Sequence, residues 1–168
     1  MSDARQGINL PACRSDGLIM NEKLKLLAKD LIRTFPRSPR ETLGGYVIAG
    51  RALDKCRAVL AETAGEYHFD CPLDRQFFDF TGIDSNAFKS FVADGATDAE
   101  VADWIGQHSK VNDRIEVVIW NNKLRHTRPC DMPAELQIFL EDYIAQFVPK
   151  NRPVYVWFDV YDLEEQRI

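Results

Sequence analysis

Long apolar runs, closely spaced cysteines and phosphate-binding glycine motifs are all missing from this 168-residue sequence. No apolar stretch approaches the roughly 20 residues of a transmembrane helix, so no membrane segment is expected. The N-terminus has no apolar core after Arg5 and does not resemble a secretory signal. The four cysteines, Cys13, Cys56, Cys71 and Cys130, form no CxxC or CxC pair, which argues against a disulfide framework and a structural zinc site. We therefore expect a cytoplasmic protein without a metal or cofactor.

Signatures of nucleotide and nucleic-acid binding are missing too. Gly44 and Gly45 are followed by Tyr46 and not by the GK[ST] ending of a phosphate loop, and no GxGxxG pattern follows a predicted strand. A net charge of −5 disfavours nucleic acid as a partner, because neutralising phosphates supplies most of that affinity. The charge is uneven: residues 20–57 hold nine lysines and arginines against four acidic residues, and residues 58–110 hold three against ten. Ion pairs between these two segments are the simplest consequence.

Apolar residues recur at helical spacing through most of the chain. Thr97-Asp-Ala-Glu100 is a capping box and the strongest helix-start signal in the sequence. Cys56 falls on the buried stripe of its predicted helix, and Ile115, Val118 and Ile119 share one helix face. The pattern predicts helices over residues 21–33, 51–64, 73–80, from 85 onward, 97–108, 112–124 and 131–147.

Residues 153–162 fit two secondary structures. Their β-branched and aromatic side chains favour a strand, whereas Pro153 suits a helix start and the chain offers no partner strand, which favours a helix. The predicted fold is therefore mainly α: a single compact orthogonal domain of about seven short helices over residues 20–168. A short extended segment near the C-terminus is allowed for, and a flexible lead-in is expected over residues 1–19.

Several short motifs carry a resemblance to a known family. They are Arg37-Ser-Pro-Arg40, Leu43-Gly-Gly-Tyr46, Arg51-Ala-Leu-Asp-Lys55, Gly65-Glu-Tyr67 and Cys71-Pro-Leu-Asp74, followed by Phe77-Phe78 and Thr81-Gly-Ile83, with a weaker match at Trp157-Phe158-Asp159. In order and spacing the chain resembles the bacterial family catalogued as domain of unknown function 5069, over residues 31–105. The resemblance implies a stand-alone, soluble bacterial domain. It implies no activity.

An arginine-rich loop next to paired glycines gives the leading functional hypothesis. Arginine forks bind phosphate or carboxylate through two hydrogen bonds, and adjacent glycines let backbone N–H groups approach an anion. We expect a binding module in which the 36–46 loop and the 67–75 turn form a pocket for a small anion or a partner's acidic segment. The competing interpretation pairs the arginines with internal carboxylates such as Glu41, Glu66, Asp70 and Asp74. The candidate ligand-binding residues are Arg37, Arg40, Gly44, Gly45, Tyr46, Tyr67, Asp74 and Arg75.

Cys71 supports an alternative hypothesis. It precedes Pro72, a natural first residue of a helix, so its thiol is expected at the N-cap of the 73–80 helix. The positive helix end favours a thiolate, and His68 is close enough in sequence to act as its base. Asp70 and Asp74 oppose this, because nearby negative charge disfavours a thiolate. The alternatives are therefore a cysteine-dependent enzyme using Cys71 and His68, or a packed structural cysteine, and whether the protein is an enzyme stays open.

A third hypothesis is a structural module for protein–protein interaction. In it an aromatic surface near the C-terminus docks a partner protein. The residues of that surface are Tyr155, Trp157, Phe158 and Tyr161. The sequence leaves the oligomeric state open.

Overall fold

The computed structural model describes residues 16–111 and 113–168, with side chains described from residue 22 onward. This part of the chain is helical and has no strand; an isolated β-bridge joins Leu43 and Tyr46. The helices are α1 (Asp16–Leu27), α2 (Ala49–Leu60), α3 (Pro72–Thr81), α4 (Ser85–Ala93), α5 (Asp98–His108), α6 (Arg114–His126), the 3-10 turn η1 (Pro129–Asp131), α7 (Ala134–Phe147) and α8 (Trp157–Glu164). The predicted mainly α fold is confirmed. Within the described ranges, no helix is both long and apolar enough to cross a bilayer.

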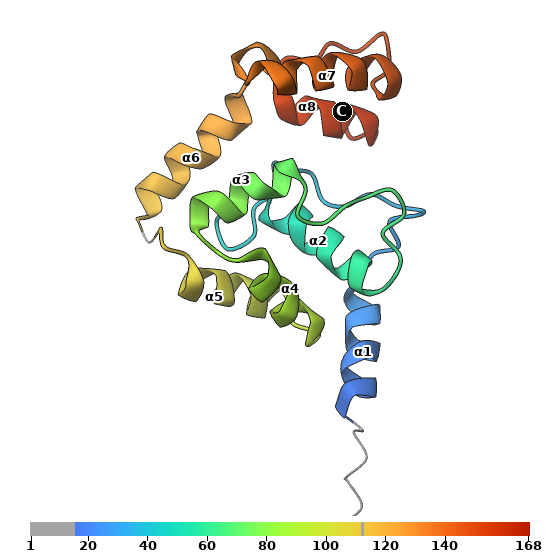
Figure 1. Ribbon diagram of the computed structural model, residues 1–168, viewed down its shortest axis with the longest axis vertical. Coiled ribbons are helices and arrows are strands. Elements are labelled where there is room, and N and C mark those ends of the chain that lie inside the picture. Colours follow the sequence, from blue (N-terminus) through green and yellow to red (C-terminus); the bar gives the residue numbers. More distant parts are fainter. Residues whose placement is uncertain (1–15, 112) are drawn as a thin grey trace, which may run out of the picture.

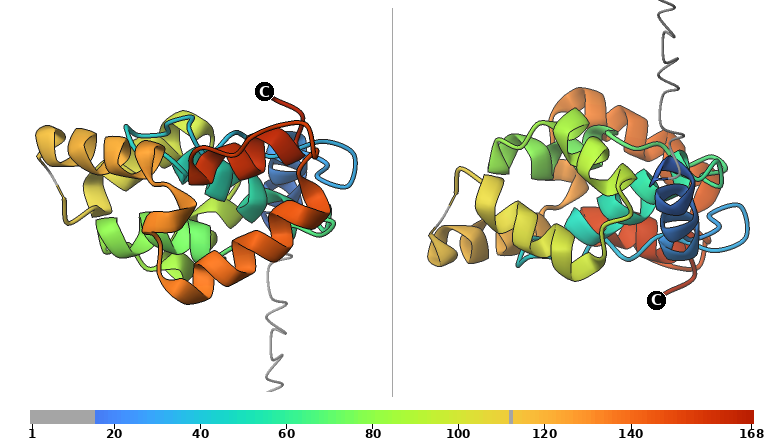
Figure 2. Two further views of the ribbon diagram at one scale, coloured as in Figure 1. Left: turned by 90° about the horizontal axis from the view of Figure 1, so that it is seen from above. Right: turned by 90° about the horizontal axis from the view of Figure 1, so that it is seen from below.

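Helix α2 lies at the centre of the molecule (Figure 1). Helices α1, α3 and α4 contact it, and α6 leads away from this body to η1, α7 and α8. Viewed from above, α2 lies beneath and between α7 and α8 (Figure 2). The C-terminal helices therefore cover one side of α2, and the α3–α5 layer covers the other.

Aromatic side chains fill the core between α2 and the α3–α5 layer. Phe77, Phe78 and Phe88 are at most 2% exposed, and the Phe78 and Phe88 ring centroids lie 5.4 Å apart in an edge-on arrangement. Burial of each such side chain contributes about 2–3 kcal/mol. The prediction that Cys56 is buried is confirmed, since its side chain is fully enclosed.

Side-chain caps fix where several helices begin. The Thr97–Glu100 capping box is present: Thr97 N donates to the Glu100 carboxylate at 2.7 Å, and Glu100 N donates to Thr97 Oγ1 at 3.3 Å. Asp84 accepts from Ala87 N at 2.8 Å and caps α4. Asp159 accepts from the N-cap amide of α8, which settles residues 157–164 as helix. Each cap satisfies an amide that the helix itself leaves free.

The prediction for the first helix is wrong at both ends. Residues 1–15 of the predicted lead-in lie outside the described residues, and residues 16–19 belong to α1. The helix stops at Leu27, six residues before the predicted end, because Asp30 and Thr63 provide other partners. The Asp30 carboxylate accepts from Ile32 N at 3.1 Å, and Leu31 N donates to Thr63 O at 2.9 Å. Local side-chain acceptors of this kind compete with helical hydrogen bonds.

Two predicted groups of apolar side chains, one on α6 and one near the C-terminus, differ from expectation in their exposure to solvent. Ile115, Val118 and Ile119 do share one face of α6, but that face is 48–69% exposed. The C-terminal aromatic surface is not formed as predicted, because Trp157 and Phe158 are at most 5% exposed. These two side chains belong to the core that holds α8 in place.

Candidate functional site

Charged side chains are buried along the central helix. Arg51, Asp54, Lys55 and Arg57 of α2 are each about 3% exposed, so α2 is enclosed on all sides over most of its length. An unpaired buried charge costs several kcal/mol, so each of these groups needs a partner. The partners come from segments far apart in the sequence.

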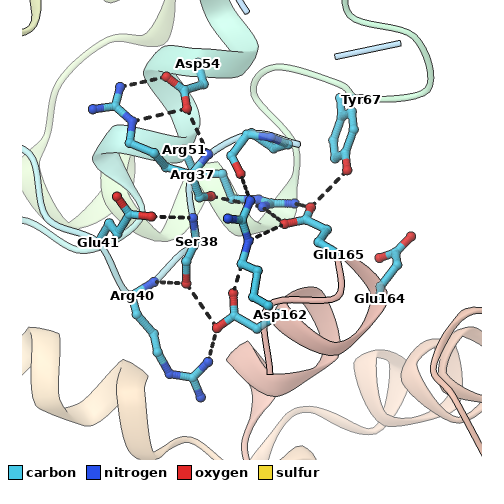
Figure 3. A network of polar contacts seen from close by, with 12 residues as sticks. Arg37, Ser38, Arg40, Glu41, Arg51, Asp54, Tyr67, Asp162, Glu164 and Glu165 are labelled. Atoms are coloured by element: carbon cyan, nitrogen blue, oxygen red, sulfur yellow. Dashed lines mark hydrogen bonds and ion pairs between the residues drawn. The ribbon is translucent and has the colours of Figure 1, made fainter. Parts of the chain in front are cut away.

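Arg51 binds the C-terminal helix. Its guanidinium group donates to both carboxylate oxygens of Glu165, at 3.0 and 2.7 Å, and the Tyr67 hydroxyl donates to the same carboxylate at 2.9 Å (Figure 3). The Arg51 guanidinium also lies 5.0 Å from the centre of the Tyr161 ring, in cation–π geometry.

Arg37, a predicted ligand-binding residue, is paired with carboxylates. It donates to Asp54 at 2.7 Å and to Asp98 at 2.6 Å, and Asp98 also accepts from Arg57 at 2.6 Å. Lys29 Nζ lies 2.7 Å from Asp54. This arrangement holds the loop after α1 against α2 and α5.

Arg40 has carboxylate partners as well. Its guanidinium donates to Asp159 at 2.5 Å. It also donates to Asp162 of α8, which accepts from Ser38 Oγ at 3.0 Å (Figure 3). Internal ion pairing, the competing interpretation for these arginines, is what the structure contains. The partners are Asp54, Asp98, Asp159 and Asp162, and not the acidic residues that the sequence suggested.

The paired glycines form a tight turn. Gly44 and Gly45 have φ values of 60° and 90°, in the region that favours glycine, and they lie between Leu43 and Tyr46, which form the β-bridge. Tyr46 is buried, and its hydroxyl lies 3.0 Å from Ser109 Oγ and 3.0 Å from Val111 O. The turn therefore joins α2 to the α5–α6 connection.

The 67–75 turn contains two further predicted ligand-binding residues, Asp74 and Arg75. Asp74 is fully buried and lies 2.8 Å from Lys55 Nζ, and its other oxygen accepts from Asp70 N at 3.0 Å. Arg75 pairs with Asp70 at 2.5 Å on the surface. Burial raises the pKa of Asp74, and the Lys55 ammonium opposes that rise.

A cavity of about 490 Å³ lies between the 66–73 segment, α7 and α8, with α2 at its base. Its walls are mainly apolar. The apolar lining residues include Leu73, Met132, Leu136, Phe139, Leu140, Trp157 and Val160. The polar lining groups include Arg51, Lys55, Tyr67, His68, Cys71, Tyr143, Tyr161 and Glu164.

Cys71 is the N-cap residue of α3, as predicted, and it faces this cavity. Lys55 Nζ donates to its sulfur at 3.1 Å. His68 lines the same cavity, but in the described part of the chain no hydrogen bond joins it to Cys71. The cation beside the thiol is therefore Lys55, which ends one of the family motifs but was not among the predicted site residues.

Two hydroxyl groups and a carboxylate complete the polar lining. Tyr143 Oη donates to Glu164 at 2.7 Å. Burial raises the pKa of Glu164, and the hydrogen bond from Tyr143 offsets part of that rise. Burial also raises the pKa of Tyr161, so its hydroxyl keeps its proton at neutral pH and is available as a donor.

The cavity brings together some of the predicted residues and not others. Tyr67, His68 and Cys71 line it. Arg37, Arg40 and the Gly44–Tyr46 turn do not line it and lie within ion-pair or turn structure. Residues from α7 and α8 form the other wall. Since α7 looks like an ordinary amphipathic helix in sequence, no local pattern could have shown that it faces Cys71.

Comparison with known proteins places the whole cavity within one family match. No curated protein matches the sequence. The family described as "Domain of unknown function (DUF5069)" matches residues 33–167, a range that includes every cavity-lining residue and extends through α8. That description names no activity. Because the match covers most of the sequence, the chain belongs to the family of domain of unknown function 5069.

Proposed function

We propose that this protein is a binding module for a small molecule with an apolar body and a polar oxygen atom. The cavity beside Cys71 carries the proposal. Its volume of about 490 Å³ lies within the roughly 300–1,000 Å³ of small-molecule sites, which are typically apolar with a few converging polar groups.

The polar groups lie where they can orient such a ligand. Lys55 Nζ of α2 lies 3.1 Å from Cys71 Sγ, at the N-cap of α3, and Tyr161 of α8 lines the same cavity. The apolar side chains of α7 form the facing wall, with Leu136 partly exposed and Phe139 55% exposed. An apolar ligand body would cover these side chains, and its oxygen atom would accept hydrogen bonds at the base.

This proposal keeps the 67–75 turn from the sequence hypothesis and leaves out the 36–46 loop. The guanidinium groups of Arg37 and Arg40 already bind carboxylates, so an anion at the loop would have to displace Asp98 or Asp159. A carboxylate ligand in the cavity stays within the proposal: Lys55 pairs with Asp74 at 2.8 Å, but Lys55 also lines the cavity, so the ligand would share this cation and need not displace Asp74.

We also propose that the protein acts in the bacterial cytoplasm and without nucleic-acid partners. The family resemblance supports a bacterial source. The three cysteines in the described ranges, Cys56, Cys71 and Cys130, are free thiols, as is usual in a reducing compartment. The net charge of −5 supports the second statement.

Ligand-induced thermal stabilisation tests the proposed cavity. The probes are 2-nonanone and decanoate, which share an apolar chain and differ in charge, with inorganic phosphate as a third. We expect one or both apolar probes to raise the melting temperature, by an amount corresponding to about 2.7 kcal/mol at a concentration 100 times Kd. Phosphate should have no effect.

A matched pair of variants on α7 locates the site. Leu136→Trp fills the cavity, whereas Ile138→Trp adds the same side chain at a position that is 68% exposed and outside the cavity lining. Leu136→Trp should abolish the stabilisation, and Ile138→Trp should retain it. A ligand-induced change in tryptophan fluorescence that is lost in Trp157→Phe, which keeps Trp104 and Trp120, gives a second readout should Leu136→Trp fail to fold. The proposal is wrong if neither apolar probe binds, or if both variants respond alike.

A further inference from the structure

The lining of the cavity includes a nucleophile, a cation and a hydrogen-bond donor: Cys71, Lys55 and Tyr161. Cys71 Sγ accepts a hydrogen bond from Lys55 Nζ at 3.1 Å, and Lys55 is only 3% exposed. The Lys55 ammonium also lies 2.8 Å from the buried Asp74 carboxylate, so it contacts both groups. The thiol therefore differs from Cys56, whose pKa burial raises to about 12, and from Cys130, an exposed residue beside Asp131.

Tyr161 supplies the free donor. This side chain is partly exposed, and it is part of the cavity lining. In the described ranges, the Tyr161 hydroxyl donates to no other residue. Its proton is thus available for an oxygen atom of a ligand.

We propose that Cys71 forms a covalent adduct with apolar α,β-unsaturated carbonyl compounds that enter this cavity. The proposal rests on the proposed binding function and specifies the ligand class of the same site. A sulfur nucleophile prefers a soft carbon electrophile, the apolar walls suit an alkyl tail, and Tyr161 and Lys55 are the donors for the carbonyl oxygen.

The reaction is an addition without an oxidant or a leaving group. The Cys71 sulfur forms a bond to the β-carbon, and the C=C π pair moves to give an enolate whose oxygen accepts a hydrogen bond from Tyr161. Solvent then protonates the α-carbon, which replaces the proton that the thiol lost. The net change is addition of S–H across the C=C bond.

Competitive labelling of the full-length protein tests this step. The protein is treated with limiting 3-nonen-2-one, digested, and the adduct at each cysteine is quantified by mass spectrometry. We expect Cys71 to react about tenfold faster than Cys130, corresponding to roughly 1.4 kcal/mol of transition-state stabilisation. Cys56 should stay unmodified, and the saturated ketone 2-nonanone should protect Cys71 but not Cys130.

Two variants and a second reagent separate recognition from general reactivity. Tyr161→Phe and Lys55→Met should each slow the adduct at Cys71 severalfold and leave Cys130 unchanged; Tyr161→Phe alone decides if Lys55→Met does not fold. Iodoacetamide, which has no apolar tail, should show a smaller preference for Cys71. Equal enone labelling of Cys71 and Cys130, or an equal preference with iodoacetamide, overturns the covalent proposal. Binding of 2-nonanone without an adduct at Cys71 would leave the proposed binding function intact, whereas loss of both would remove both.

Discussion

Arg51 and Glu165 form a buried ion pair between the central helix and the C-terminal end of α8. Both side chains are at most 3% exposed, and two hydrogen bonds of 3.0 and 2.7 Å join them. Because α8 also forms one wall of the cavity, this pair positions a part of the proposed site. Its removal therefore affects both stability and ligand binding.

Arg51→Met should destabilise the protein by an amount near the lower end of about 3–5 kcal/mol, since the buried Glu165 carboxylate keeps only the partly exposed Arg167 as a cation, at 3.2 Å. Adding Glu165→Gln should restore part of this loss, because the Tyr67 hydroxyl still finds an acceptor. Urea unfolding measures the free energy of unfolding of the single and the double variant. Arg128→Ala is the matched control, because its pair with Asp131 is on the surface and its loss should be undetectable. Equal effects of the two arginine substitutions would contradict a structural role for the buried pair.

Asp98 should make the stability of the fold decrease as the pH falls. Burial acts to raise its pKa, but hydrogen bonds and charges from Arg57 and Arg37 outweigh this and lower the pKa below its ordinary value. A lowered folded-state pKa contributes stability that is complete above the unfolded-state pKa of about 3.9 and is lost as the pH falls through the folded value. Asp98→Asn should therefore be less stable than the unsubstituted protein at pH 7, and the difference should shrink below about pH 4.

Melting temperatures between pH 7 and pH 3 measure this effect. Asp103→Asn, an exposed change on the same helix α5, is the control and should give parallel curves. A constant difference between Asp98→Asn and the unsubstituted protein over the whole range would show that the Asp98 ion pairs do not set the pH dependence.

Replacing glycine by alanine should have opposite effects on stability at Gly106, within α5, and at Gly82, which ends α3. Gly106 lies within α5 with no atom near the position of an added Cβ, so Gly106→Ala should stabilise the protein by about 0.5–1 kcal/mol. Gly82 ends α3 with φ +67°, and an added Cβ would lie 2.6 Å from the Lys110 side chain. Gly82→Ala should destabilise by about 1–2 kcal/mol, because alanine is strained in the left-handed region. Chemical denaturation measures the stability of both variants. A change of the same sign in the two variants would contradict the different backbone roles given to Gly106 and Gly82.

The fold could be predicted where local signals and tertiary packing agree. The Thr97–Glu100 capping box and the apolar stripe that includes Cys56 depend on spacing within one helix, and both are confirmed. The end of the first helix could not be predicted, because Leu31 N bonds to Thr63 O, a partner more than thirty residues away.

The site was harder to predict for a related reason. An amphipathic pattern identifies apolar residues but treats charged residues as exposed, whereas Arg51, Lys55 and Arg57 are buried with carboxylate partners from other elements. Only the fold shows that Lys55 lies beside Cys71 and that Tyr161 of α8 faces the same cavity. The motif around Cys71 identified one wall of the cavity, and the remaining wall comes from helices with no motif.

Glu164 should make the stability of the fold depend on pH in the opposite direction to Asp98. Burial raises its pKa above the ordinary value, so at neutral pH the folded protein holds a carboxylate that is costly to desolvate. A raised folded-state pKa means that the folded state binds the proton more tightly than the unfolded state. The free energy of unfolding therefore rises as the pH falls from above the folded-state pKa of Glu164 toward its unfolded-state pKa. Glu164→Gln should therefore be more stable than the unsubstituted protein at pH 8, with a smaller difference near pH 4.5.

Thermal melting across this pH range measures the effect of Glu164→Gln. The amide oxygen of the glutamine can still accept from Tyr143 Oη, so the hydrogen bond at 2.7 Å is conserved and only the charge is removed. Tyr143→Phe is the matched variant: it removes the hydroxyl that stabilises the carboxylate and should lower stability more at pH 8 than at pH 4.5. The two variants must shift stability in opposite directions at pH 8 if a desolvated Glu164 carboxylate lines the cavity. A loss of stability in Glu164→Gln at pH 8 would instead show that the charge itself stabilises this wall.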